Sequence, residues 1–164
     1  MQHKTCSECG SDGTVVRGSY PFKESGLNVV LHGIQILKCA KCGTEEPIIP
    51  RMNDLMRTIA FAVVDKPYAL RGEEIRFLRK YLRMTGDEFC RVLHVDRTTL
   101  SKWENNEDKV GRQSDLLIRS VALALGEGLK EKMEEVVRDF ERIKKSARRV
   151  TVSVDSQTRE YKYA

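Results

Sequence analysis

The sequence lacks long apolar segments. Of its 164 residues, 40% are hydrophobic and only 7% are aromatic. The longest apolar runs, residues 59–64 and 121–125, fall far short of the roughly 20 residues that a membrane-spanning helix needs. No apolar stretch typical of an export signal stands near the start of the sequence. We therefore expect a globular, cytoplasmic protein with no membrane-spanning segment.

A strong excess of one charge is also missing. The chain carries 29 Lys and Arg against 24 Asp and Glu, which gives a net charge of +5 and a pI near 9.0. The excess is spread along the chain and forms no basic tail. Such a charge suits a polyanionic partner without identifying one. The motifs must therefore indicate the function.

Cysteine is scarce, and its pattern is informative. Cys6 and Cys9 form one Cys-x-x-Cys pair, Cys39 and Cys42 form another, and Cys90 stands alone. In a chain with no export signal, such pairs favour metal binding over disulfides. A two-residue gap lets both sulfurs of a pair reach one ion, and the glycine after each pair permits a tight turn. We expect one structural Zn²⁺ held by these four thiolates.

Two other uses of the paired cysteines have less support. A catalytic zinc keeps one ligand position open, and four cysteines leave none. A redox Cys-x-x-Cys usually stands alone at the start of a helix in an α/β pattern. His3 and His32 are expected to be surface or turn residues, because two intact cysteine pairs need no histidine ligand. Cys90 is expected to be a small core residue.

Residues 1–48 are predicted to form a zinc ribbon. Between the cysteine pairs, residues 14–22 and 27–37 are rich in Val, Ile, Leu and aromatic side chains, and a polar segment separates them. This pattern predicts a β-hairpin whose second strand carries Cys39 to the metal.

Residues 49–70 are predicted to form a connector. Apolar residues recur at spacings of three and four from Met52, and a proline follows at position 67. This spacing predicts an amphipathic helix that ends before Lys66 and packs against one of the domains.

Residues 71–126 are predicted to contain a helix-turn-helix. Thr85 and Glu88 have the arrangement of a capping box, in which a hydroxyl and a carboxylate satisfy free N–H groups at a helix start. Asp96 is expected to cap the following helix. Two short helices joined by a tight turn suit the major groove of DNA. The expected helices span residues 73–83, 86–93 and 97–105.

The polar face of the third of these helices carries the candidate DNA-binding residues. Arg and Lys suit the O6 and N7 atoms of guanine, and Thr can hydrogen-bond a base or touch a thymine methyl group. We expect these side chains to contact base edges in double-stranded DNA. They are Arg97, Thr98, Thr99, Ser101 and Lys102.

Residues 84–89 (Met-Thr-Gly-Asp-Glu-Phe) and 96–105 (Asp-Arg-Thr-Thr-Leu-Ser-Lys-Trp-Glu-Asn) resemble the lambda-repressor-like, or XRE, helix-turn-helix family. The run Leu-Ser-Lys-Trp-Glu-Asn is the most specific part. The resemblance implies that Arg97, Thr98 and Lys102 face bases. It also implies that Asn105 contacts a phosphate through its backbone.

The chain departs from this family at two positions. Gly86 stands where the family often has a glutamine that supports DNA contact, which predicts weaker binding. His94 stands where the family usually has a turn glycine. A left-handed backbone at His94 would accommodate this change, because histidine is moderately enriched there among residues other than glycine.

The order of the modules resembles a narrower group. Residues 29–34 (Val-Val-Leu-His-Gly-Ile) precede the second cysteine pair, and the helix-turn-helix follows, as in YgiT-type zinc fingers and MqsA-type antitoxins. The resemblance covers about residues 4–125. It implies that the zinc module can bind a ribonuclease toxin while the C-terminal domain dimerises on an operator palindrome.

Residues 127–164 are predicted to form a helix and a short hairpin. Apolar residues continue at helical spacing from Leu129 to Ile143, and residues 150–154 and 159–163 alternate like strands. The preceding segment, residues 116–125, is apolar around most of a helical circumference, so we expect it to be buried.

A homodimer through residues 114–146 is expected, because a two-fold dimer doubles the DNA contacts and fixes the half-site spacing. A basic cluster near the end of that region suits either phosphate contact or, as we favour, the dipole at a helix C-terminus. It comprises Lys144, Lys145, Arg148 and Arg149.

The sequence therefore predicts an α+β protein of two domains: a zinc ribbon, and a mainly helical lambda-repressor-like domain with C-terminal helices and a short hairpin. Its predicted function is sequence-specific transcriptional regulation, as a repressor, with zinc in a structural role; bound to DNA, it would lie in the nucleoid. The alternative is a type II antitoxin that neutralises a ribonuclease toxin by protein contact and autoregulates its operon. An enzyme is not expected, because no Ser/His/Asp set, carboxylate cluster or open metal site is evident.

Overall fold

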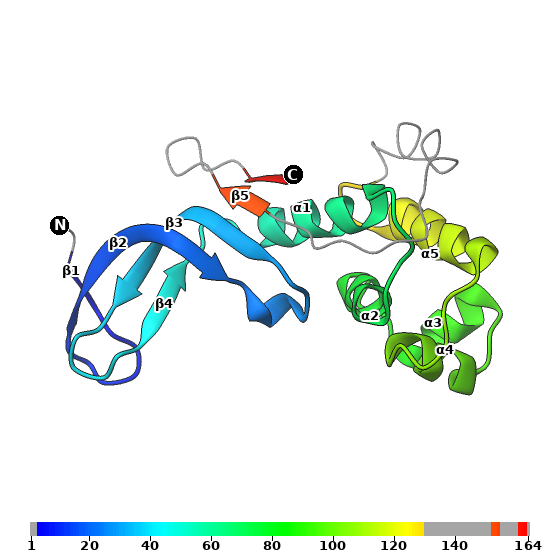
Figure 1. The fold of residues 1–164 in the computed structure, drawn as a ribbon, viewed down its shortest axis with the longest axis horizontal. Coiled ribbons are helices and arrows are strands. Elements are labelled where there is room, and N and C mark those ends of the chain that lie inside the picture. Colours follow the sequence, from blue (N-terminus) through cyan, green and yellow to red (C-terminus); the bar gives the residue numbers. More distant parts are fainter. Residues whose placement is uncertain (1–2, 130–151, 155–160, 164) are drawn as a thin grey trace.

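The computed structural model describes residues 3–129, 152–154 and 161–163, and within them the fold is α+β (Figure 1). Strands occupy the first third of the chain and return near its end, and helices lie between them. No described helix is both long and apolar enough to span a membrane. The N-terminal strands are β1 (His3–Thr5), β2 (Asp12–Pro21), β3 (Val30–Lys38) and β4 (Glu45–Ile48). The helices are α1 (Met52–Asp65), α2 (Gly72–Tyr81), α3 (Gly86–Leu93), α4 (Arg97–Glu104) and α5 (Arg112–Leu125), and β5 (Val152–Val154) and β6 (Tyr161–Tyr163) follow.

The predicted N-terminal hairpin is confirmed. β2 and β3 pair antiparallel, with Thr14 opposite Lys38 and Pro21 opposite Val30. The second strand begins three residues later than expected. A short 3-10 turn and the left-handed Gly26 (φ 72°) first reverse the chain. The side chains of Leu27 and Val29 are then buried in the core before the strand begins.

The predicted C-terminal hairpin is also confirmed, and it joins the N-terminal sheet. β5 pairs antiparallel with β6. β5 also pairs in parallel with β3, where Leu31 lies opposite Val152 and His32 opposite Ser153. β4 pairs with the later part of β3, at Gln35 to Lys38. The sheet therefore contains strands from both ends of the sequence, an arrangement that no local sequence pattern indicated.

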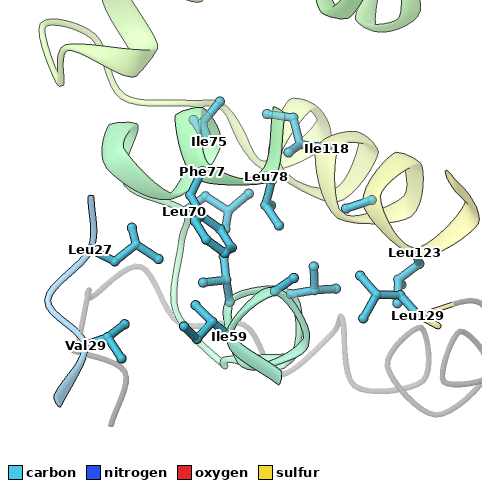
Figure 2. Close-up of a cluster of buried hydrophobic side chains, with 14 of the residues drawn as sticks. Leu27, Val29, Ile59, Leu70, Ile75, Phe77, Leu78, Ile118, Leu123 and Leu129 are labelled. Carbon is cyan, nitrogen blue, oxygen red and sulfur yellow. The ribbon is translucent and has the colours of Figure 1, made fainter. Parts of the chain in front are cut away.

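The helix predicted for the connector is present as α1, and it lies within a continuous core. Figure 2 shows Leu27 and Val29, which precede β3, near Ile59 of α1 and Phe77 of α2. All four side chains belong to one cluster of buried residues that extends to Ile118 of α5. The hairpin and the helices are therefore packed together through α1.

The three helices predicted for residues 73–105 are present, each within two residues of its expected bounds. The first ends at Tyr81 rather than at residue 83. Arg83 adopts a left-handed conformation (φ 57°), which a continuing right-handed helix does not allow. The change of direction there leads into Thr85, the N-cap of α3.

The expectation that residues 116–125 are buried holds for one face of the helix only. In α5, the side chains of Leu117 and Leu125 are 42% and 57% exposed. The buried face instead includes two charged residues, Asp115 and Arg119, with Arg119 fully buried. The helix therefore has a charged residue, Arg119, at a buried position, which its largely apolar composition did not indicate.

Arg119 joins α5 to the end of α1. Its guanidinium donates hydrogen bonds to the backbone carbonyls of Val64 (2.5 Å), Lys66 (3.0 Å) and Tyr68 (2.6 Å). Its Nε also donates to Asp115 Oδ1 at 2.6 Å. Carbonyls at a helix C-terminus have no partner within the helix. Arg119 satisfies one such carbonyl, that of Val64, and two carbonyls of the segment that follows α1, which accounts for a charge in the core.

A second buried ion pair reinforces this junction. Lys66 Nζ lies 2.6 Å from Glu74 Oε2, and both side chains are less than 8% exposed. The same Glu74 oxygen accepts the backbone N–H of Arg71 at 2.7 Å, at the start of α2. On the other side, Asp115 Oδ2 accepts the N–H of Leu70 at 2.6 Å. Side chains of α2 and α5 thus hold the segment between α1 and α2 in place.

The close approach of α2 to the end of α4 requires glycine at position 72. A Cβ atom there would overlap the carbonyl oxygen of Trp103 and lie 2.7 Å from that of Glu104. Both are backbone atoms, which cannot rotate away. We expect Gly72→Ala to destabilise the protein by about 1–3 kcal/mol, the cost of overpacking a well-packed contact, in urea unfolding followed by the emission of Trp103. Gly111→Ala is the matched control, because a Cβ there meets nothing within 4 Å; equal losses for the two variants would contradict the expectation.

Two expectations fall outside the described residues. They are the helix from Leu129 to Ile143, beyond its first residue, and the basic cluster of residues 144–149.

Candidate metal centre and nucleic-acid interface

The four paired cysteines are brought together at one end of the sheet. Their sulfur atoms all lie within 4.8 Å of one another. Two contacts join one pair to the other: Cys6 Sγ lies 3.6 Å from Cys42 Sγ, and Cys9 Sγ lies 3.5 Å from Cys39 Sγ. Around a tetrahedral Zn²⁺ with Zn–S bonds of about 2.3 Å, neighbouring sulfurs lie about 3.8 Å apart. The donor set and its spacing therefore suit a metal ion of this kind.

The two cysteine turns have the same backbone geometry. In the first, the N–H of Gly10 donates to the carbonyl of Cys6 at 3.1 Å, and in the second, the N–H of Gly43 donates to the carbonyl of Cys39 at 2.9 Å. Both glycines are left-handed, with φ of 70° and 75°. This conformation is readily open to glycine, which explains why glycine follows each pair.

The neighbouring Thr44 stabilises the thiolate of Cys42, the form that binds a metal. The pKa of Cys42 is lowered to about 6, because the Thr44 hydroxyl and then its backbone N–H hydrogen-bond the sulfur. The hydroxyl lies 3.1 Å from Cys42 Sγ. Hydrogen bonds around metal ligands hold them in place and tune the site, so Thr44 would support a bound metal. No sequence pattern indicated Thr44, although it lies two residues after Cys42.

His32 is not among the clustered metal-ligand side chains of the described residues. His32 lies on β3, and its Nδ1 is 2.8 Å from the Ser19 hydroxyl on the exposed face of β2. His32 therefore has the surface position that the sequence predicted. Cys90 is buried and away from the other cysteines, as expected of a core residue.

The corner between α3 and α4 is fixed by the predicted caps. At the start of α3, Glu88 N–H donates to the Thr85 hydroxyl at 3.3 Å, and Thr85 N–H donates to the Glu88 carboxylate at 2.8 Å. At the start of α4, Thr99 N–H donates to Asp96 Oδ1 at 2.8 Å. Between them, His94 is left-handed, with φ of 53° and ψ of 44°. All three local expectations are confirmed.

Most of the candidate DNA-binding side chains lie exposed on α4 and at its end. Arg97, Thr98, Ser101, Lys102 and Asn105 are exposed, whereas Thr99 is half-buried. The Thr99 hydroxyl donates to Asp96 Oδ2 at 2.6 Å, so it takes part in the helix cap. A hollow of about 550 Å³ lies beside this face, lined by residues that include Arg97, Thr98, Ser101 and Lys102. The structure therefore brings four of the predicted residues to one surface.

Two arginines of α2 hold α4 in position. Arg79 Nε lies 2.7 Å from Glu104 Oε1, and Arg76 Nε lies 3.3 Å from Glu104 Oε2. Arg76 also donates to the backbone carbonyl of Glu104 at 3.0 Å and to Asn105 Oδ1 at 2.7 Å. The Arg79 and Glu104 side chains are 15% and 11% exposed, so this pair is shielded from water. These residues could not be identified from the sequence, because ion pairs between helices leave no local sequence pattern.

A comparison with protein-family models finds no match to the chain, and a comparison with curated proteins finds none either.

Proposed function

We propose that the chain is a sequence-specific regulator of transcription, a repressor, that binds double-stranded DNA. In this proposal α3 and α4 form a helix-turn-helix, and α4 is the recognition helix that enters the major groove. The observation that carries it is the corner between two eight-residue helices. A three-residue turn joins them, and the second helix presents Arg97 and Lys102 on an exposed face.

The geometry supports base contact by α4. Its N-terminal turn is capped by Asp96 and leaves Arg97 and Thr98 exposed, and recognition helices contact bases mainly through their N-terminal residues. The bracing by Arg79 and Glu104 fixes the helix before binding, which lowers the entropy lost on complex formation. Phosphate contact at Asn105 and base contact by Ser101 belong to the same proposal.

In the same proposal the cysteine cluster holds one structural Zn²⁺ and makes residues 1–48 a zinc ribbon. When bound, the metal would connect the two cysteine turns, and it would take no part in a reaction. A homodimer through residues 114–146 would place two copies of α4 one helical turn of DNA apart, roughly 34 Å.

A test is to select preferred sequences from random duplexes, with Lys102→Ala beside the unchanged protein. Loss of one base contact is expected to cost about 1–3 kcal/mol and to relax the preference at one position. Lys23→Ala is the matched control, since it removes the same charge from an exposed site before β3. The proposal fails if selection returns no preferred sequence and binding depends only on salt concentration.

The order of the modules favours a second function, that of an antitoxin. In this alternative the cysteine-bearing sheet binds a ribonuclease toxin, and DNA binding by α4 serves autoregulation. A gene for a small, basic, ribonuclease-like protein beside the gene for this chain would support it. Co-expression of that protein is the test: it should be toxic alone and harmless when this chain is present.

A further inference from the structure

The space above Gly86 is occupied by the side chain of Arg97. A Cβ atom built on Gly86 would overlap Arg97 Nη1 and lie 2.7 Å from Arg97 Cζ and 3.3 Å from Nη2. The guanidinium of the first residue of α4 therefore lies across the first residue of α3. Any side chain at position 86 would displace it.

Asp87, the next residue of α3, orients this guanidinium. Asp87 Oδ1 lies 3.2 Å from Arg97 Nε, and the two side chains are 76% and 65% exposed. An ion pair so exposed contributes little to folding stability. The ion pair uses only the Nε of Arg97, so the four other N–H donors of the guanidinium stay available for further hydrogen bonds. Gly86 thus leaves room for the Arg97 guanidinium, and Asp87 favours this orientation of it, at a position that folding stability does not require.

We infer that Gly86 is a specificity-determining residue: it leaves room for Arg97, which Asp87 holds ready to contact guanine at one position of the DNA site. This inference rests on the proposed function. An arginine that donates two hydrogen bonds to guanine O6 and N7 makes the commonest specific base contact. Holding the side chain in advance lowers the entropy lost on binding. Gly86 therefore favours base recognition. The resemblance to the helix-turn-helix family had instead predicted weaker DNA binding, because glycine replaces a glutamine there.

The test compares Gly86→Ala, Arg97→Ala and the double variant for binding to the selected duplex and to duplexes changed at single base pairs. Gly86→Ala is expected to lower the preference for guanine at one position by about tenfold, within the range of one bidentate contact. Arg97→Ala should lower it at the same position. The double variant should lose no more than Arg97→Ala alone, because the glycine acts only through the arginine.

Folding is a separate readout in this test. The melting temperature of Gly86→Ala should be unchanged or slightly raised, because alanine is the better helix former and only the end of a flexible side chain must move. Gly111→Ala is the matched control and should leave every base preference unchanged.

The outcomes separate the inference from the proposed function. If the unchanged protein selects no sequence, the proposed function fails. If it selects a sequence but Gly86→Ala keeps the full preference at every position, the inference is overturned. It is also overturned if Gly86→Ala weakens binding to all duplexes equally, or if its effect persists when Arg97 is absent.

Discussion

Removing the metal from the full chain is expected to unfold the cysteine end of the sheet and to leave the helices folded. The four sulfurs of the two cysteine turns lie within 4.8 Å of one another, so a bound metal would join the turns, and β1 and β4 are only three and four residues long. Structural zinc contributes about 10–16 kcal/mol of binding free energy in small zinc-dependent folds. Such short strands bury too little surface to replace it.

The position of the single tryptophan makes this prediction measurable. Trp103 is 8% exposed and lies in α4, far along the chain from the four paired cysteines. Chelation should reduce the strand signal in far-ultraviolet circular dichroism while the emission of Trp103 stays unchanged. Cys39→Ala should abolish bound zinc, measured by elemental analysis, and Cys90→Ala should retain it. Zinc-free protein with an unaltered spectrum would show that the metal has no structural role.

Replacing Arg119 is expected to cost about 3–5 kcal/mol of stability, as for breaking other buried ion pairs. Arg119→Met removes the partner of Asp115 and of three backbone carbonyls at once. Methionine has a similar length but cannot donate a hydrogen bond. The buried carboxylate is then left with the N–H of Leu70 as its one remaining partner among these contacts.

Urea unfolding, followed by circular dichroism and Trp103 emission together, measures this loss. Arg112→Met is the matched control, because Arg112 is exposed on the same helix and surface substitutions usually change stability by less than about 0.5 kcal/mol. If the two variants differ by less than about 1 kcal/mol, the network around Arg119 does not stabilise the junction between α1 and α5.

The features predicted correctly from the sequence are those with local causes. The capping residues Thr85 and Asp96 act on atoms three residues away, and the glycines after the cysteine pairs act within a single turn. The hairpin strands are adjacent along the chain. In each case the residues that interact are close enough in sequence for spacing and residue type to predict the contact.

The features that could not be predicted depend on residues far apart in the chain. Arg119 contacts a carbonyl 55 residues away, so α5 alone gives no reason to bury a charge. The arginines of α2 that hold Glu104 lie 25 and 28 residues before it. The position of Arg97 depends on the absence of a side chain at Gly86 in another helix. A composition or a periodicity contains none of this information.

The parallel pairing of β5 with β3 has a consequence for synthesis. Leu31 and its partner Val152 are separated by about 120 residues, so a ribosome adding about 5–20 residues per second completes β5 roughly 6–24 s after β3. Throughout that interval the growing chain presents the backbone of β3 at Leu31 and His32 without its native partner. An unpaired strand edge is a site where other chains can attach. The nascent protein is therefore exposed to misassociation at this edge until β5 is available to pair with β3.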